Sequence, residues 1–200
     1  MTNSEVAGTR SENITRAEAS DRSDLISTTS YEVVLDLTST GPTFTTTTTA
    51  VFACTTPGAN TWIDLIAPTV ESVVLNGESL STAKVVQGAR ILLPNLAATN
   101  TLVVTAQGKY MNTGEGLHRF IDPVDNETYL YTQFESADAR RMYACFEQPD
   151  LKATFTLTAT VPGNWKVISN SPMAQVTEHD NDTKTWEFEP TPTLSTYITA

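Results

Sequence analysis

The sequence predicts an all-β domain, folded as a β-sandwich-like structure or a large twisted sheet and preceded by one short helix. Apolar and polar residues alternate with a period of two in many short segments, and β-branched Thr and Val are frequent in them. Turn-forming dipeptides separate these segments, which number about a dozen. Such spacing is typical of a sandwich or a twisted sheet. The sequence shows no internal repeat, which argues against a solenoid or a propeller.

The one expected helix lies near the N-terminus, at about Thr15–Leu25. Thr15 and Glu18 have the spacing of a capping box, in which each side chain satisfies a backbone N–H group of the other residue. Residues 1–14 are polar and are expected to be flexible. The folded domain is therefore predicted to span residues 15–200.

The first strands follow the helix directly. From Ser30 the period changes to two, and Tyr31–Leu37 predicts a strand with one buried face. The run 43–49 is almost entirely threonine and leads into the apolar segment 50–53, so we predict an exposed strand paired with the first. Asn76-Gly77 indicates a hairpin turn. Further strands are expected at 61–65, 70–75, 84–86, 89–93, 101–107, 128–135, 153–161, 165–169, 174–178 and 184–188.

The composition is that of a globular, acidic protein. Of the 200 residues, 40% are hydrophobic, and the formal net charge is −11 with a pI of about 4.5. This charge disfavours nucleic acid and anionic membranes as partners, because both attract clusters of Lys and Arg, and it favours a cationic ligand. No segment has the apolar core of a secretory signal or the ~20 apolar residues of a membrane span. A cytoplasmic location is therefore expected.

Neither a metal site nor the machinery of a self-sufficient enzyme is visible in the sequence. Cys54 and Cys145 stand outside any metal-ligand spacing, so we expect reduced, partly buried thiols rather than a single disulfide. His118 and His179 are too far apart for an H-E-x-x-H zinc motif, and we predict a structural role for His118 and a solvated turn position for His179. The sequence contains no Gly-rich phosphate loop and no G-x-S-x-G elbow.

One pair of side chains has the chemistry to bind a ligand. Tyr129–Glu135 is predicted as a strand, which places Gln133 and Glu135 on the same face. A carboxylate beside an amide can receive an ammonium group, since the carboxylate supplies charge and the amide carbonyl a further acceptor. The competing interpretation is a solvated strand face whose acid pairs with Arg140 or Arg141. Spacing alone favours this second interpretation.

Several motifs around this pair occur in a recognisable order along nearly the whole chain. They are Tyr131-Thr-Gln-Phe-Glu135, Ala139-Arg-Arg141, Cys145-Phe146 and Pro149-Asp150, preceded by Gly114–Phe120 and followed by Leu194–Tyr197. This series resembles the N-terminal domain of the aminopeptidase N family of zinc metallopeptidases, of the gluzincin type, and Gly114–Phe120 is similar to its actinobacterial branch. Phe146-Glu147-Gln148-Pro149 replaces the commoner F-D-x-P motif and keeps its acidic character.

The resemblance implies a saddle-shaped β domain that packs against a zinc catalytic domain, expected after residue 200 and absent from this chain. The zinc ligands and catalytic residues would lie in that domain, so this chain is expected to hold neither and to be inactive alone. The full-length enzyme would release N-terminal amino acids from peptides. The family position that recognises the free α-amine of the peptide substrate matches Glu135, and a neighbouring subsite glutamine matches Gln133. Arg140 and Arg141 are expected to pair with acidic residues and to lock the turn that follows.

Two alternatives stay open at the level of sequence. One is a stand-alone β-sandwich that binds a protein or a carbohydrate without catalysis, and the other is a family member that has lost its zinc and become a scaffold. Residues 196–200 look like an unfinished strand, which favours a boundary inside a longer protein over a stand-alone module.

Overall fold

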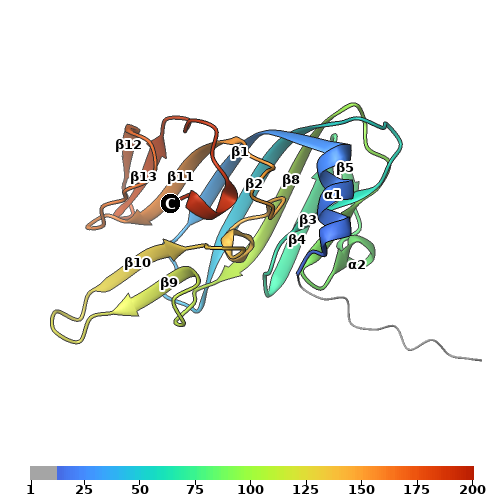
Figure 1. Cartoon of the computed structure of the whole chain (residues 1–200). Coiled ribbons are helices and arrows are strands. Elements are labelled where there is room, and N and C mark those ends of the chain that lie inside the picture. The colour runs from blue at the N-terminus through green and yellow to red at the C-terminus, as the bar shows by residue number, and fades with distance from the viewer. Residues whose placement is uncertain (1–12) are drawn as a thin grey trace, which may run out of the picture.

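A computed structural model describes residues 13–200, and its main element is a curved sheet of eight strands (Figure 1). The strand order is β12-β13-β11-β1-β2-β8-β4-β5, in which β1 and β11 are parallel. The expectation for residues 1–14 falls mostly on residues 1–12, which lie outside the described part of the chain. The eight strands are β1 (Ile26–Asp36), β2 (Thr43–Cys54), β4 (Thr69–Leu75), β5 (Glu78–Leu80), β8 (Thr99–Lys109), β11 (Thr154–Pro162), β12 (Met173–His179) and β13 (Thr183–Phe188).

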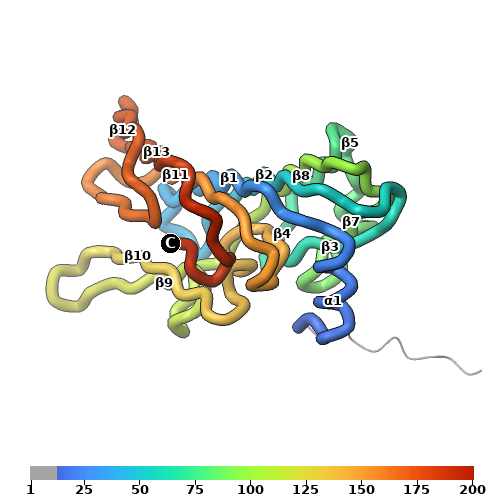
Figure 2. The backbone as a smooth tube through the Cα atoms, turned by 45° about the horizontal axis from the view of Figure 1, so that its top comes forward, coloured from blue at the N-terminus to red at the C-terminus, as the bar shows by residue number. Residues whose placement is uncertain are grey.

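Smaller elements complete the described chain. They are the sheet of β3 (Thr61–Asp64), β6 (Val86–Gln87) and β7 (Arg90–Leu93), the hairpin of β9 (Gly116–Ile121) and β10 (Thr128–Gln133), and the helices α1 (Arg16–Leu25), α2 (Thr82–Val85), η1 (Ala139–Arg141) and η2 (Thr196–Ile198). Figure 2 shows the β9–β10 hairpin and the C-terminal end on the same side of the large sheet. The predicted all-β, sandwich-like domain with one short N-terminal helix is confirmed.

The local signals that were strongest in the sequence are confirmed in detail. Thr15 Oγ1 accepts a hydrogen bond from the Glu18 N–H at 3.2 Å, and the Glu18 carboxylate accepts one from the Thr15 N–H at 2.9 Å, so the capping box is complete. Strands β1 and β2 pair in antiparallel fashion, as expected. Asn76 and Gly77 have positive φ angles of 53° and 82° and join β4 to β5, which is the hairpin that their dipeptide predicts.

The threonine run in β2 is part-buried on one face and buried on the other, although an exposed strand was expected. Strand β2 lies between β1 and β8, and its residues alternate between part-buried and buried along the whole strand. Thr46 and Thr48 face the covered side, at 2% and 1% exposure. The Thr48 hydroxyl accepts a hydrogen bond from the backbone N–H of Ala144 at 3.1 Å. A threonine in this position therefore fastens the segment that covers the sheet.

Two other segments differ from the prediction of strand. Residues 84–86 include the end of α2, because the Ser81 carbonyl accepts hydrogen bonds from the N–H groups of Lys84 and Val85 at 2.9 and 3.1 Å. Residues 165–169 leave the sheet after β11, where Trp165 and Val167 pack against the core and Ile168 is exposed. An apolar run of this length does not distinguish these outcomes.

The C-terminal residues 196–200 begin with η2 and not with the expected strand. The Thr196 hydroxyl donates to the buried carboxylate of Glu147 at 2.5 Å, and the Thr199 hydroxyl lies 2.8 Å from the phenol oxygen of Tyr143. These contacts require a turn that points both hydroxyls inward. The hydrogen bonds of the Thr196 and Thr199 hydroxyl groups therefore favour a turn over a strand in this segment.

Helix α1 is fixed to the body of the domain by two ion pairs. Arg22 is fully buried and donates from Nη1 to Asp64 Oδ2 at 2.8 Å, while Arg90 donates from both terminal nitrogens to Glu18 at 2.6 and 3.1 Å. Both guanidinium groups also lie over the ring of Trp62, at 4.8 and 4.4 Å from its centroid. The polar helix is thus held by charge pairs against β3 and β7.

We expect Asp64→Ala to lower the free energy of unfolding of the chain by about 3–5 kcal/mol, because it leaves the Arg22 guanidinium buried without its anion. Urea denaturation followed by circular dichroism measures this loss. The matched control is Glu178→Ala, which removes an exposed partner of Lys184 and should change the unfolding midpoint little. Equal, small effects of both substitutions would contradict the argument.

The pH dependence of stability should carry the signature of Glu18. Its hydrogen bonds with Arg90, followed by the Thr15 N–H, lower the pKa of Glu18 from 4.5 to about 2. Because the folded-state pKa is the lower one, this contribution is complete above about pH 5 and is lost as the pH falls towards 2. The difference in unfolding free energy between the chain and Glu18→Gln should therefore shrink over that range. A difference that stays constant from pH 6 to pH 2 would rule this out.

Candidate functional site

The two residues singled out by the sequence lie at the end of β10. Gln133 is the last residue of the strand, and Glu135 lies beyond it, so the predicted strand to Glu135 is too long. The strand ends there because the Phe134 carbonyl accepts a hydrogen bond from the Asp138 N–H at 3.0 Å and starts a turn. The peptide bond between Glu135 and Ser136 is cis. Both Gln133 and Glu135 are exposed, and the Gln133 amide donates to the Glu135 carbonyl at a long 3.4 Å.

Phe134, between these two residues, anchors the turn in the core. It is 1% exposed, and its ring packs edge-on against Tyr143 with centroids 6.2 Å apart. Tyr143 contacts Tyr31 and Phe155 in the same way, at 6.3 and 6.1 Å. Through Phe134, the exposed Gln133 and Glu135 are therefore anchored to a cluster of buried rings that packs on the large sheet.

The β9–β10 hairpin supports the site from the side. His118 on β9 stacks on Tyr131 of β10 with centroids 4.6 Å apart, and its Nδ1 accepts a hydrogen bond from the Gly114 N–H at 3.0 Å. These contacts give His118 the structural role that the sequence predicts. His179 is exposed at the end of β12, 2.8 Å from the Thr185 hydroxyl.

The two arginines that follow the pair both have structural partners. Arg140 is buried. Its backbone N–H donates to the Glu147 carboxylate at 2.8 Å, and its side-chain Nε donates to the Ala137 carbonyl at 2.9 Å. Arg141 donates from Nε to Asp138 at 2.7 Å, and its Nη2 lies 3.8 Å from Glu115. Pairing with acidic residues of the turn is confirmed for Arg141.

Glu147 has a role that sequence reasoning missed. Its carboxylate accepts from the Arg140 N–H and from the Thr196 hydroxyl, so it joins the turn after the site to the C-terminal segment. Burial raises the pKa of this carboxyl group. Its neighbour Cys145 and the distant Cys54 are both unpaired, as predicted, but both are buried rather than partly buried. Burial raises the pKa of the Cys145 thiol as well.

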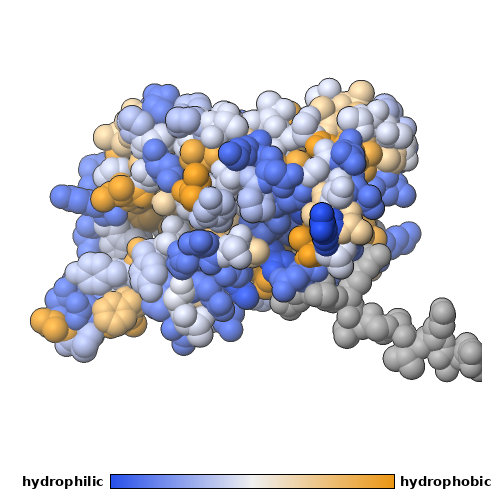
Figure 3. Space-filling model, in the orientation of Figure 1, coloured by the Kyte–Doolittle hydropathy of each residue, from blue (hydrophilic) through white to orange (hydrophobic). Residues whose placement is uncertain are grey.

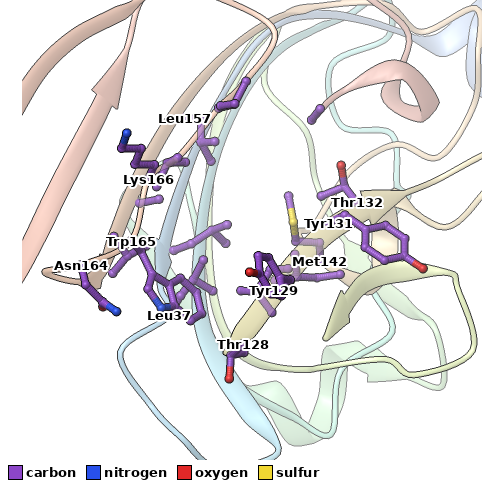
Figure 4. Close-up of a pocket in the computed structure, with 18 of the residues that line it drawn as sticks. Leu37, Thr128, Tyr129, Tyr131, Thr132, Met142, Leu157, Asn164, Trp165 and Lys166 are labelled. Atoms are coloured by element: carbon purple, nitrogen blue, oxygen red, sulfur yellow. The ribbon is translucent and has the colours of Figure 1, made fainter. Parts of the chain in front are cut away.

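An apolar groove of about 700 Å³ runs along β10, and Figure 4 shows Leu37, Leu157 and Trp165 on one side of it and Tyr129, Thr132 and Met142 on the other. Its walls come from β10, from the face of β1 and β11, and from residues 164–168, with Ala200 at its border. Figure 3 shows apolar surface on the hairpin and on the part of the molecule above it. Residues with large exposed side chains at this side are Phe120, Ile121, Val124, Tyr129, Tyr131 and Ile168.

The described residues do not fit a zinc ion. Among residues 13–200, no group of three or more His, Cys, Asp or Glu side chains is arranged to hold a metal. The candidate site offers the Glu135 carboxylate and the Gln133 amide, which suit an ammonium group.

Comparison with known protein families decides what kind of domain carries this site. The family model described as the Peptidase M1 N-terminal domain matches residues 27–198. The chain belongs to this family. The match covers the large sheet, the hairpin, the site and η2, whereas α1 (Arg16–Leu25) precedes the matched residues.

Individual relatives agree with the family. Aminopeptidase N of Streptomyces lividans is 54% identical over 191 residues, which cover 94% of this chain and 22% of that protein. Aminopeptidase N of Acetobacter pasteurianus is 38% identical over 106 residues, or 50% of this chain and 29% of that protein. A probable aminopeptidase 1 of Sulfurisphaera tokodaii is 39% identical over 79 residues, or 40% of this chain and 10% of that protein. The aligned residues therefore make up less than a third of the length of each of these relatives.

Within residues 13–200 of this M1 N-terminal domain, no helix combines the length and the apolar character needed to cross a membrane.

Phe134→Ala should lower the unfolding free energy by about 3–5 kcal/mol, because it empties a fully buried ring position between the site and the aromatic cluster. Denaturant unfolding of the chain measures the loss. Phe120→Ala on the same hairpin serves as the control and should cost much less, since that ring is already 45% exposed. Similar losses for the two variants would show that Phe134 is not the anchor of the turn.

Proposed function

We propose that this M1 N-terminal domain anchors the free N-terminus of peptide substrates in a zinc aminopeptidase, and that the chain alone is inactive. The observation that carries the proposal is the placement of Gln133 and Glu135 together, exposed at the end of β10 and held from below by buried rings. Family membership over residues 27–198 favours this function over a stand-alone module that binds a protein or a carbohydrate.

The chemistry of the pair explains how a peptide end would be selected. The Glu135 carboxylate supplies a negative charge for the substrate's α-ammonium group, and the Gln133 amide carbonyl supplies a further acceptor. A peptide without a free amine would leave the carboxylate desolvated and unpaired once the site is covered, which costs free energy. The enzyme would therefore act from the peptide terminus and release one N-terminal amino acid at a time.

The remaining parts of the enzyme would lie outside this chain. We propose that zinc and the residues that ligate it lie in a catalytic domain after residue 200, which membership of the M1 family supports. The aligned residues are only 22% of the Streptomyces aminopeptidase N, and the remaining length of that relative supports a further domain. That domain is the partner we propose for the apolar groove, because an exposed apolar surface is typical of an interaction site. We further propose a cytoplasmic location, with neither nucleic acid nor membrane as partner, on the basis of the acidic composition.

Kinetics of the full-length protein test the role of Glu135. Glu135→Ala should lower kcat/KM for peptides with a free N-terminus by about 30-fold to several thousand-fold, the equivalent of about 2–5 kcal/mol for a charge pair buried on binding. N-acetylated peptides should be poor substrates for both proteins. Glu178→Ala, on the outermost strand β12, is the control and should leave kcat/KM unchanged. Near-normal kinetics of Glu135→Ala would remove Glu135 from the substrate site.

A further inference from the structure

The segment from Gln133 to Arg141 forms a closed loop, and Glu135 lies on it. Gln133 pairs with Gly116 in the β9–β10 ladder, at the position where the loop begins. Arg141 ends the loop as the last residue of η1. The loop is closed if Arg141, at its end, contacts Gly116, which lies opposite Gln133 at its start.

Arg141 makes this closure with its aliphatic stem. A Cβ atom built on Gly116 would lie 2.8 Å from the Cβ and 3.3 Å from the Cδ of Arg141, so the stem is in direct contact with the Gly116 backbone. Paired residues of an antiparallel ladder have Cα atoms about 4.5–5.5 Å apart. The Arg141 stem thus contacts Gly116, the residue that pairs directly with Gln133 on the neighbouring strand. Gly116 has a φ of 66°, which also favours glycine at this position.

The charged end of Arg141 holds the stem in place from two directions. Its Nε donates to Asp138 within the loop at 2.7 Å, and its Nη2 lies 3.8 Å from Glu115, which precedes Gly116. The side chain of Arg141 is 23% exposed. A planar guanidinium group can address two carboxylates at fixed angles, whereas a lysine ammonium cannot. Arg141 therefore ties the loop to itself through Asp138 and to the hairpin through Glu115.

Gln133 and Glu135 have little else to fix their directions. Both side chains are exposed, and the contact between them is the 3.4 Å bond from the Gln133 amide to the Glu135 carbonyl, which is weak at that length. The buried ring of Phe134 anchors the loop in the core. The closure at Arg141 adds a direct contact between the two ends of the loop, in addition to the hydrogen bond from the Arg140 backbone N–H to Glu147.

We infer that Arg141 is a positioning residue that closes the Gln133–Arg141 loop and so fixes where the Glu135 carboxylate meets the substrate's α-amine. This role goes beyond the pairing of an arginine with acids, since it acts on substrate through Glu135. The inference rests on the proposed function. Its effect should appear in the catalysis of free-amine peptides, because small displacements of a substrate-orienting group are costly to rate.

A double-mutant cycle in the full-length enzyme tests this role. Arg141→Ala should lower kcat/KM for a free-amine peptide by about tenfold to a hundredfold. In the Glu135→Ala background the same substitution should change kcat/KM by less than about twofold, because the group that Arg141 positions is gone. Gly116→Ala, whose added methyl group would displace the Arg141 stem, should give the same pattern and replaces Arg141→Ala if that variant does not fold.

Arg119→Ala is the matched control. Arg119 belongs to the same hairpin, but it donates to the carbonyls of Thr40 and Gly41 and lies over Tyr110, away from the loop. It should leave kcat/KM within about twofold of the parent enzyme.

The outcomes separate the inference from the proposed function. An effect of Arg141→Ala that is equally large with and without Glu135 overturns the positioning role, while a large effect of Glu135→Ala alone keeps the proposed function. An active enzyme in which Glu135→Ala has no effect overturns both. Loss of the Arg141 effect in the Glu135→Ala background supports both.

Discussion

The carboxylate of Asp64 is the point at which three separate parts of the chain meet. It accepts hydrogen bonds from Arg22 of α1, from the Trp62 indole within β3 and from the N–H of Glu147, and the Asp64 backbone also pairs with Cys145 in both directions. A buried carboxylate without such partners would be strongly destabilising. The position of the helix, the small sheet and the segment behind the site therefore depends on this one group being fully paired.

Much of the fold could be predicted from the sequence because its signals are local. Period-two alternation located the strands of the large sheet, and the Thr15 and Glu18 pair and the Asn76-Gly77 dipeptide carry their backbone geometry within a few residues. The failures occur where a distant group decides the structure. Thr48 and Thr196 look like surface strand residues until the backbone of Ala144 and the carboxylate of Glu147 are placed beside them.

In the candidate site, too, some residues could be identified from the sequence and others could not. Gln133 and Glu135 could be identified because a motif surrounds them, and spacing alone placed them on one strand that in fact ends at Gln133. Gly116 and Glu147 lie within motifs that the sequence shows, but the motifs gave neither residue a role, since the importance of a missing side chain or of a buried acid depends on what lies next to it in space. The glycine could have been found only by knowing that β9 pairs with β10, a hairpin whose first strand was not predicted.

The order of the large sheet also determines how the domain meets other copies of itself. Its two outer strands are β5, which has three residues, and β12, whose register shifts between Met173 and Gln175 and whose Glu178 pairs with Lys184. Short, irregular and charged outer strands offer few free backbone groups in a straight row, so they are poor templates for the edge-to-edge growth that leads to fibrils. The long, regular strands with the highest β-propensity, including the threonine-rich β2, are enclosed between neighbours. The arrangement therefore keeps the part of the chain most able to polymerise away from every open edge of this sheet.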